Sequence, residues 1–245
     1  MLQWVTFGAS TIGPAHVITG KPNQDSWASF HRSNYDVLAV SDGLGSKTFS
    51  ELGRVAACRA VDAAARSAKH NIGTIDLTSD EGKAFFFDDL LNAWLSEISP
   101  INADDACATC LFAIRDEETI WLGMLGDGAI AIILGDGSIR ICQEEKDESF
   151  SNMTISLSQS TRPSDWVVSS IPSDDCRAIL MCTDGVSDDL IDVEGFAGGL
   201  VSYLSEMPTS SASSRLYEIL NEWPMPKHSD DKTIACMMRR DFEDE

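Results

Sequence analysis

The chain has 245 residues, and its 39 acidic side chains outnumber its 18 lysines and arginines, giving a formal net charge of −21. Nucleic acids and anionic membranes bind basic surfaces, so this charge argues against both as partners. No apolar run approaches about 18 residues, so no membrane span is expected, and the N-terminus lacks the basic start and apolar core of a signal peptide. Together with seven cysteines, an odd number, these features predict a cytoplasmic protein with reduced, buried thiols.

The first part of the chain predicts three strands followed by two long helices. Period-2 and helical patterns place the strands at residues 3–10, 26–32 and 35–41 and the helices at 46–68 and 84–98. Residues 13–25 are predicted to form a loop, and Ser33 with Asn34 a turn between strands. Three hydroxyl residues before the first helix are candidate caps: Ser46, Thr48 and Ser50.

The remaining chain is rich in short strands. Four apolar runs separated by turns predict an antiparallel meander, at 106–114, 119–126, 129–135 and 138–142. A strand pair, two helices and a last strand follow, at 165–171 with 177–183, at 189–207 and 213–223, and at 232–240. Residues 207–214 are the best loop candidate, but no segment is long enough to link domains. We therefore expect one α+β domain over residues 1–245, with antiparallel sheets covered by helices.

Acidic motifs stand where apolar runs meet turns. There are five of them: Gln24-Asp25, Asp42-Gly43, Asp127-Gly128, Asp184-Gly185 and Asp230-Asp231. Carboxylates at the ends of neighbouring strands converge, and several close together need a cation to offset their repulsion. The glycines permit sharp turns. The pattern predicts a binuclear site for hard metal ions.

Each aspartate has a simpler explanation when taken singly, as a turn residue whose side chain accepts backbone N–H groups. Asp127 suits a hairpin turn as well as a metal site, and Asp136 is predicted to be only a turn residue. Asp188 and Asp189 are alternatively caps of the helix that follows them.

The order of the motifs, QD…DGxG…GDG…TDGxxD…DDxT, resembles that of the metal-dependent serine/threonine protein phosphatases of type 2C, especially their compact bacterial branch. The resemblance extends from about Gly8 to Met238. It implies a sandwich of two antiparallel β-sheets flanked by α-helices, with two or three Mn²⁺ or Mg²⁺ ions at one end.

The resemblance also implies roles for individual residues. Asp42 would bridge two ions, with the Gly43 carbonyl serving one of them, and Asp184 and Asp230 would complete the shell of the first ion. These three aspartates would be the catalytic set. Asp231 takes the place of Asp230 if the register differs by one residue.

Four further residues would belong to the outer parts of the site. Gln24 and Asp25 lie in the loop that supports the second ion through waters. Asp188 matches the position linked to an additional, weaker ion, and Asp127 would help that outer site or hold a strand turn.

The expected chemistry also follows from the residue types. Hard divalent ions prefer carboxylate, carbonyl and water ligands, and two such ions would acidify a bridging water and orient a phosphate ester. No cysteine in the chain is followed by an arginine with five residues between the two, so no cysteine phosphatase is indicated. Cys107 and Cys110 would face opposite sides of a strand, so zinc is not expected. The resemblance to type 2C phosphatases implies that the substrate is phosphoserine and phosphothreonine on proteins.

The chain departs from the family pattern at three positions. Gly20 stands where relatives carry a phosphate-binding arginine, Gln24 where they carry glutamate, and Leu44 where some carry histidine. Lys21 and His16 are the candidate substrate-binding residues instead. These departures leave two rivals open: a non-catalytic binding module or regulator of a kinase, and a phosphoesterase for small molecules. A phosphoprotein substrate and a serine/threonine kinase are the candidate partners.

Overall fold

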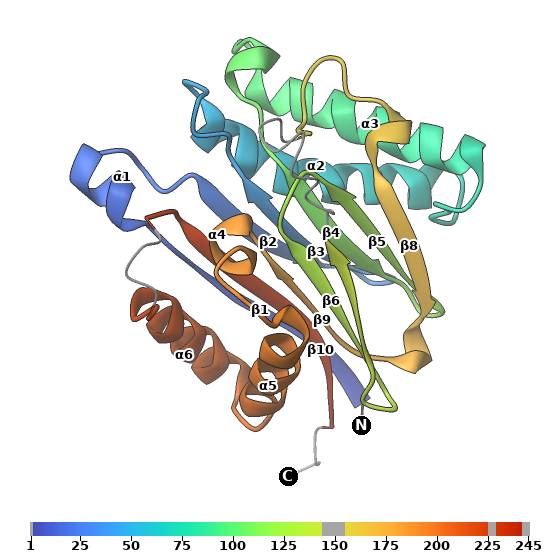
Figure 1. Cartoon of the computed structure of the whole chain (residues 1–245). Helices are drawn as coiled ribbons and strands as arrows, with labels where there is room; N and C mark the ends of the chain where they lie inside the picture. The colour runs from blue at the N-terminus through green and yellow to red at the C-terminus, as the bar shows by residue number, and fades with distance from the viewer. Residues whose placement is uncertain (1, 144–154, 225–228, 242–245) are drawn as a thin grey trace.

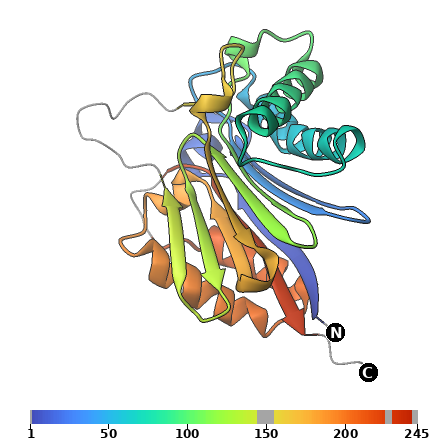
Figure 2. The same cartoon turned by 90° about the vertical axis from the view of Figure 1, so that its right-hand side faces the viewer.

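The computed structural model describes residues 2–143, 155–224 and 229–241, and in these ranges the chain forms two stacked antiparallel sheets (Figures 1 and 2). The first sheet has the strand order β1-β10-β9-β6-β7. Its strands are β1 (Leu2–Thr11), β6 (Ala129–Leu134), β7 (Ile139–Gln143), β9 (Cys176–Cys182) and β10 (Lys232–Asp241). The second has the order β2-β3-β4-β5-β8. Its strands are β2 (Asp25–His31), β3 (Asp36–Asp42), β4 (Cys110–Arg115), β5 (Thr119–Leu125) and β8 (Val167–Pro172).

Helices cover the outer face of each sheet. The pair α2 (Ser50–Asn71) and α3 (Asp80–Ile98) lies on the second sheet, and α5 (Val193–Ser205) with α6 (Thr209–Asn221) lies on the first (Figure 1). Two short helices, α1 (Pro14–Thr19) and α4 (Asp184–Ser187), lie at the end of the sandwich away from the termini (Figure 1). The predicted sandwich of two antiparallel sheets flanked by helices is confirmed.

Three apolar layers hold the sandwich together, one between the sheets and one under each helix pair. On β3, Val37 and Ala39 face the layer under α2 and α3, whereas Leu38 and Val40 face the layer between the sheets. Successive side chains on a strand point to opposite faces, so a strand buried on both sides reads as a continuous apolar run.

The close seating of α2 requires small residues. Six of its buried positions are alanine, and a Cβ added at Gly53 would lie 1.7 Å from the carbonyl oxygen of Ala106. Trp94 on α3 donates its indole N–H to the Gly53 carbonyl at 3.0 Å. Helix α2 is therefore fixed in distance and rotation against α3 and the loop before β4.

The predicted meander is wrong in its pairing. β4 pairs with β5 and β6 pairs with β7, but β5 and β6 belong to different sheets. The chain crosses between sheets at Gly126–Gly128, where Gly126 and Gly128 have φ values of 93° and 108°. The predicted pair 165–171 with 177–183 fails for the same reason, because β8 pairs with β5 and β9 with β6 and β10. Periodicity identifies strands, but a tight Gly-Asp-Gly turn joins two sheets as readily as one hairpin.

The ends of several helices also differ from the prediction. The first long helix begins at Ser50, and its N-cap Phe49 makes no side-chain cap bond, so none of the predicted caps acts. Helix α1 was predicted as loop, and α6 begins at Thr209 inside the predicted loop 207–214. Within the described residues, no helix is long and apolar enough to cross a membrane.

Candidate metal centre

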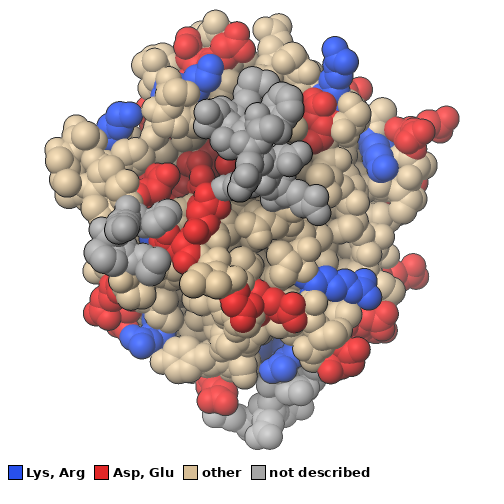
Figure 3. Space-filling model, in the orientation of Figure 1, with Lys and Arg blue, Asp and Glu red and all other residues tan. Residues whose placement is uncertain are grey.

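Strand ends from both sheets meet beside α1 and α4 and carry the acidic motifs. Asp25 begins β2 and pairs directly with Asp42 at the end of β3. Asp184 follows β9 as the first residue of α4, and Asp230 stands just before β10, the strand that pairs with β9. Figure 3 shows acidic side chains gathered in a hollow at this end of the molecule. The sequence motifs are therefore brought together, two from each sheet.

The carboxylates in this cluster are costly to ionise together. Burial raises the pKa of Asp25 to about 6, although the Thr183 hydroxyl donates a 2.7 Å hydrogen bond to it. Burial and the neighbouring charges of Asp25 and Asp184 raise the pKa of Asp42 well above its usual range. Burial and then the charges of Asp127 and other nearby aspartates raise the pKa of Asp184 to about 7. A cation among these groups would favour their ionised forms.

The donor set fits a hard divalent ion. The four converging aspartates offer only oxygen, which Mg²⁺ and Mn²⁺ prefer. The side-chain oxygen Oε1 of Gln24 is buried and has no hydrogen-bond partner in the part of the chain that the structure describes, whereas its Nε2 donates to Ser50 Oγ at 2.6 Å. A Cβ added at Gly43 would lie 2.5 Å from the Ser50 carbonyl oxygen, so only glycine permits this approach of the backbone.

His16 lies beside the last acidic motif. Ligand-type atoms of His16, Asp230 and Asp231 all lie within 4.8 Å of one another. The Asp231 side chain is buried and accepts a 2.8 Å hydrogen bond from His16 Nδ1, whereas Asp230 is exposed. His16 is thus anchored next to the cluster through Asp231.

The loop after α1 has little cationic character. Gly20, in place of the arginine, has a left-handed φ of 70° and ends α1. Lys21 is exposed, and its Nζ donates to the Gly45 carbonyl at 3.3 Å. Leu44 is half-buried in the loop after β3. Lys21 is therefore the exposed cation nearest to the first motif in the sequence.

The outer acidic residues have mixed surroundings. Asp127 is half-buried in the turn between the sheets, and Asp188 is the exposed C-cap of α4. Their charges raise the pKa of Asp184, after the larger contribution of burial. The alternative that Asp188 or Asp189 caps the next helix is wrong, because the Asp192 side chain accepts from Gly195 N in that role.

Predictions for residues outside the candidate ligand set also have outcomes. Asp189 is buried and accepts a 2.7 Å hydrogen bond from the Trp223 indole, which links the end of α4 to the chain after α6. Asp136 forms the predicted turn between β6 and β7 and accepts from Ser138 N at 2.9 Å. All seven cysteines are free, and Cys107 and Cys110 are both buried.

Sequence reasoning missed two residues of this region. Arg54 on α2 is half-buried, and its charge interacts with those of Asp25 and Asp231, while burial lowers its pKa. Its Nε has no hydrogen-bond partner among the described residues. Thr183, which bonds Asp25, directly precedes Asp184. Nothing in the sequence distinguishes Arg54, because it lies in an alanine-rich helix that otherwise packs in the core. Thr183 could have been found, because it directly precedes the aspartate of the fourth motif.

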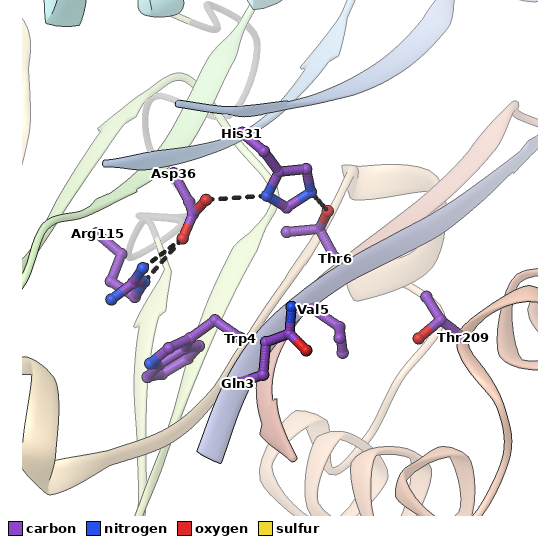
Figure 4. A pocket seen from close by; sticks show the side chains of 8 residues that line it. All are labelled: Gln3, Trp4, Val5, Thr6, His31, Asp36, Arg115 and Thr209. Atoms are coloured by element: carbon purple, nitrogen blue, oxygen red, sulfur yellow. Dashed lines mark hydrogen bonds and ion pairs between the residues drawn. The ribbon is translucent and has the colours of Figure 1, made fainter. Parts of the chain in front are cut away.

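A separate hollow of about 440 Å³ lies at the far ends of β2 and β3 (Figure 4). Asp36 accepts from Arg115 at 2.6 Å and from His31 Nδ1 at 2.9 Å, and the other ring nitrogen of His31 bonds the Thr6 hydroxyl. Arg115 also lies 5.5 Å from the centre of the Trp4 ring. These polar groups satisfy one another, which leaves the carboxylate cluster at the opposite end as the candidate site.

Comparison with known proteins identifies the family of this chain. A family model described as protein phosphatase 2C matches residues 12–221, a range that contains the candidate ligands other than Asp230. The catalytic domain of the serine/threonine protein phosphatase PstP, solved with two manganese ions, is 15% identical with a TM-score of 0.62, over 98% of this chain and 100% of that chain. A bacterial serine phosphatase is 16% identical with a TM-score of 0.65, over 99% and 100% of the two chains.

A third solved structure contains the phosphatase domain of SpoIIE from Bacillus subtilis. It is 15% identical with a TM-score of 0.61, over 99% of this chain and 65% of that chain. A comparison with curated proteins gave no match. At these identities the solved structures establish the fold, and the fold and family together support metal-dependent phosphatase activity. Because the family model matches most of its length, this chain belongs to the protein phosphatase 2C family.

Proposed function

We propose that the chain hydrolyses phosphoserine and phosphothreonine on proteins, with Mn²⁺ or Mg²⁺ held by the carboxylate cluster. The observation that carries the proposal is the convergence of Asp25 and Asp42 from one sheet with Asp184 and Asp230 from the other. Burial and, to a smaller extent, neighbouring carboxylates raise the pKa values of Asp25, Asp42 and Asp184, which supports the proposal because a cation favours the ionised forms. The solved manganese complex of the PstP domain supports the choice of metal.

The proposed ligands divide into an inner and an outer group. Asp42 would serve two ions, with the Gly43 carbonyl, Asp184 and Asp230 completing the set around the first. Gln24 and Asp25 would support the second ion through waters. The Oε1 atom of Gln24 suits such a contact, because it is buried and has no hydrogen-bond partner among the described residues. Asp127 and Asp188 are the candidates for a further, weaker site.

When bound, the ions would supply positive charge for the phosphate oxygens and acidify water for attack. The protein residues then orient the substrate. Lys21 offers a single point charge where an arginine would offer a two-pronged grip. His16 is tied through Nδ1 to Asp231, so Nε2 is the ring nitrogen that remains for the substrate, where in the neutral ring it would accept a proton or a hydrogen bond. A cysteine nucleophile is not required, and burial raises the pKa of the Cys58 and Cys182 thiols to about 12, which disfavours thiolate.

The proposal includes a phosphoprotein substrate, a partner kinase that generates it, and a reducing compartment such as the cytoplasm, in keeping with seven free cysteines.

Asp42→Asn is the decisive variant. Hydrolysis of a phosphothreonine peptide with manganese should fall on the order of a hundredfold or more, because a ligand shared by two ions is lost.

The matched control is Asp136→Asn, in the turn between β6 and β7, which should retain wild-type turnover. EDTA should abolish the activity of the wild-type protein. Near wild-type turnover by Asp42→Asn at saturating manganese would refute the ligand assignment. No activity on any phosphopeptide, together with hydrolysis of nucleotides, would instead favour a small-molecule phosphoesterase.

A further inference from the structure

The side chain of Asp231, just before β10, accepts hydrogen bonds from the segment that precedes β2. This side chain is 1% exposed. Oδ1 accepts from the backbone N–H of Gly13 at 2.6 Å, and Oδ2 accepts from both His16 Nδ1, at 2.8 Å, and the backbone N–H of Gln24. The three donors come from the beginning, middle and end of one twelve-residue stretch, residues 13–24. One carboxylate thus fixes both ends of this segment and its helix α1.

The backbone on both sides of Asp231 reinforces this attachment. Ala15 N donates to the Ser229 carbonyl at 3.0 Å. A Cβ added at Gly13 would lie 2.3 Å from the Asp230 carbonyl carbon, so the two segments of the chain lie too close together for any residue with a side chain at position 13. The segment therefore lies directly along residues 229–231, next to the candidate ligand Asp230.

The hydrogen-bond pattern requires a carboxylate at this position. An ionised carboxylate only accepts, and here it receives three donors on two oxygens. A carboxamide has one oxygen, so its NH₂ group would face either the Gly13 N–H or the Gln24 N–H. Such a donor–donor contact leaves buried N–H groups without partners, which is costly. Both oxygens of Asp231 are thus engaged by the segment 13–24, whereas the Asp230 side chain accepts none of these three bonds.

We propose that Asp231 is a positioning residue that sets the segment 13–24, and with it Gln24, Asp25 and the His16 ring, against the carboxylate cluster. The bond to Oδ2 places the proton of neutral His16 on Nδ1 and leaves Nε2 unprotonated. The placement itself is independent of the reaction. Its consequence for phosphate hydrolysis rests on the proposed function.

The test compares Asp231→Asn with Asp230→Asn in EDTA and without substrate. Amide hydrogen exchange across residues 13–24 should be at least about tenfold faster in Asp231→Asn, because bonds to a charged acceptor are lost or reversed. Exchange in β3 and β9 should be unchanged. Asp230→Asn is the matched control: it removes the adjacent carboxylate but none of the three bonds, so exchange in 13–24 should stay at the wild-type rate.

A second measurement covers the case in which Asp231→Asn does not fold. Imidazole ¹⁵N chemical shifts of the wild-type protein, at a pH where His16 is neutral, should report the Nδ1–H tautomer. An Nε2–H tautomer would overturn the proposal, as would a folded Asp231→Asn protein with exchange in 13–24 within about twofold of wild type. Both readouts use metal-free protein, so they are unaffected if the chain proves not to hydrolyse phosphopeptides.

If the proposed phosphatase function also holds, turnover should depend on this attachment. Asp231→Asn should then need more manganese for half-maximal activity and have a lower kcat at saturation. His16→Ala, which removes one donor and keeps the Gly13 and Gln24 bonds, should change the manganese requirement less. Equal shifts in the two variants would show that Asp231 acts only through His16, contrary to the proposal.

Discussion

Raising the pH should destabilise the metal-free protein between about pH 4 and 7, where many proteins become more stable. The cause is the carboxylate cluster. Burial raises the pKa of Asp25 from 3.8 to about 6 and that of Asp184 to about 7. The folded protein therefore holds these protons more tightly than the unfolded chain does. This stability is fully present below pH 3.8 and is lost as the pH rises through the folded-state values.

The size of the effect follows from the shift at Asp25, which is buried. A rise of roughly two pKa units corresponds to ~3 kcal/mol of unfolding free energy. Asp184 acts with the same sign up to about pH 7. It is only half-buried and shares neighbours with Asp25, so the two contributions do not add in full. A loss of about 3 kcal/mol is large beside the total stability of ~5–15 kcal/mol that is usual for a domain.

Urea unfolding in EDTA at pH 4.5, 6 and 7.5, followed by tryptophan fluorescence, measures this loss. Asp25→Asn should flatten the pH dependence over this range, since the amide does not titrate and can still accept from Thr183. Asp136→Asn is the control, because hydrogen bonds from Ser138 lower the pKa of Asp136 and its titration falls below the range. A wild-type protein that gains stability from pH 4.5 to 7.5, or an Asp25→Asn protein with the wild-type slope, would refute the reasoning. Manganese should reverse the slope, because metal binding requires deprotonated ligands.

The remaining predictions concern the first motif and the seating of α2. Gln24→Glu should lower the manganese concentration for half-maximal activity by restoring a negative charge, and unchanged metal titration would contradict its placement. Lys21→Ala should raise KM for a phosphopeptide without shifting the metal titration, and the opposite result would mean that its role is misassigned. Gly53→Ala should lower the unfolding free energy by about 2 kcal/mol or more, because the new methyl meets the Ala106 carbonyl. Gly199→Ala is the control, because a Cβ added there meets no atom within 4 Å, and it should stabilise helix α5 by about 0.5–1 kcal/mol. Similar urea midpoints for Gly53→Ala and Gly199→Ala would contradict this account.

Much of the fold could be predicted because its signals are local. The strands alternate or are buried on both faces, so the run that became β3 was recognisable from residues 35–41 alone. Pairing between strands was not, because the turn at Gly126–Gly128 looks the same whether it joins neighbours or crosses to the other sheet. Helix α1 was missed because it has only six residues and buries none of them, which leaves no periodic pattern.

The candidate site was predictable to the extent that its residues stand in short motifs. Asp42 and Asp184 follow apolar strands directly, so their convergence followed from strand ends meeting. The contacts of Asp231 could not be read in this way. Its donors Gly13 and Gln24 are more than two hundred residues away in the sequence, and only the fold brings β10 beside that segment. The same holds for Arg54, whose charge reaches the cluster from a helix that otherwise serves the core.

The proposed ligand set draws on both sheets equally, with Asp25 and Asp42 on one and Asp184 and Asp230 on the other. The first ion, shared by Asp42 on one sheet and by Asp184 and Asp230 on the other, would be a cross-link between the two halves of the sandwich. The affinity of the protein for this ion would then depend on how the two sheets are aligned. A substitution that loosens the apolar layer between the sheets would weaken metal binding although it changes no ligand. The coupling is reciprocal: the bound ion resists separation of the sheets, and mechanical strength and metal loading rise and fall together.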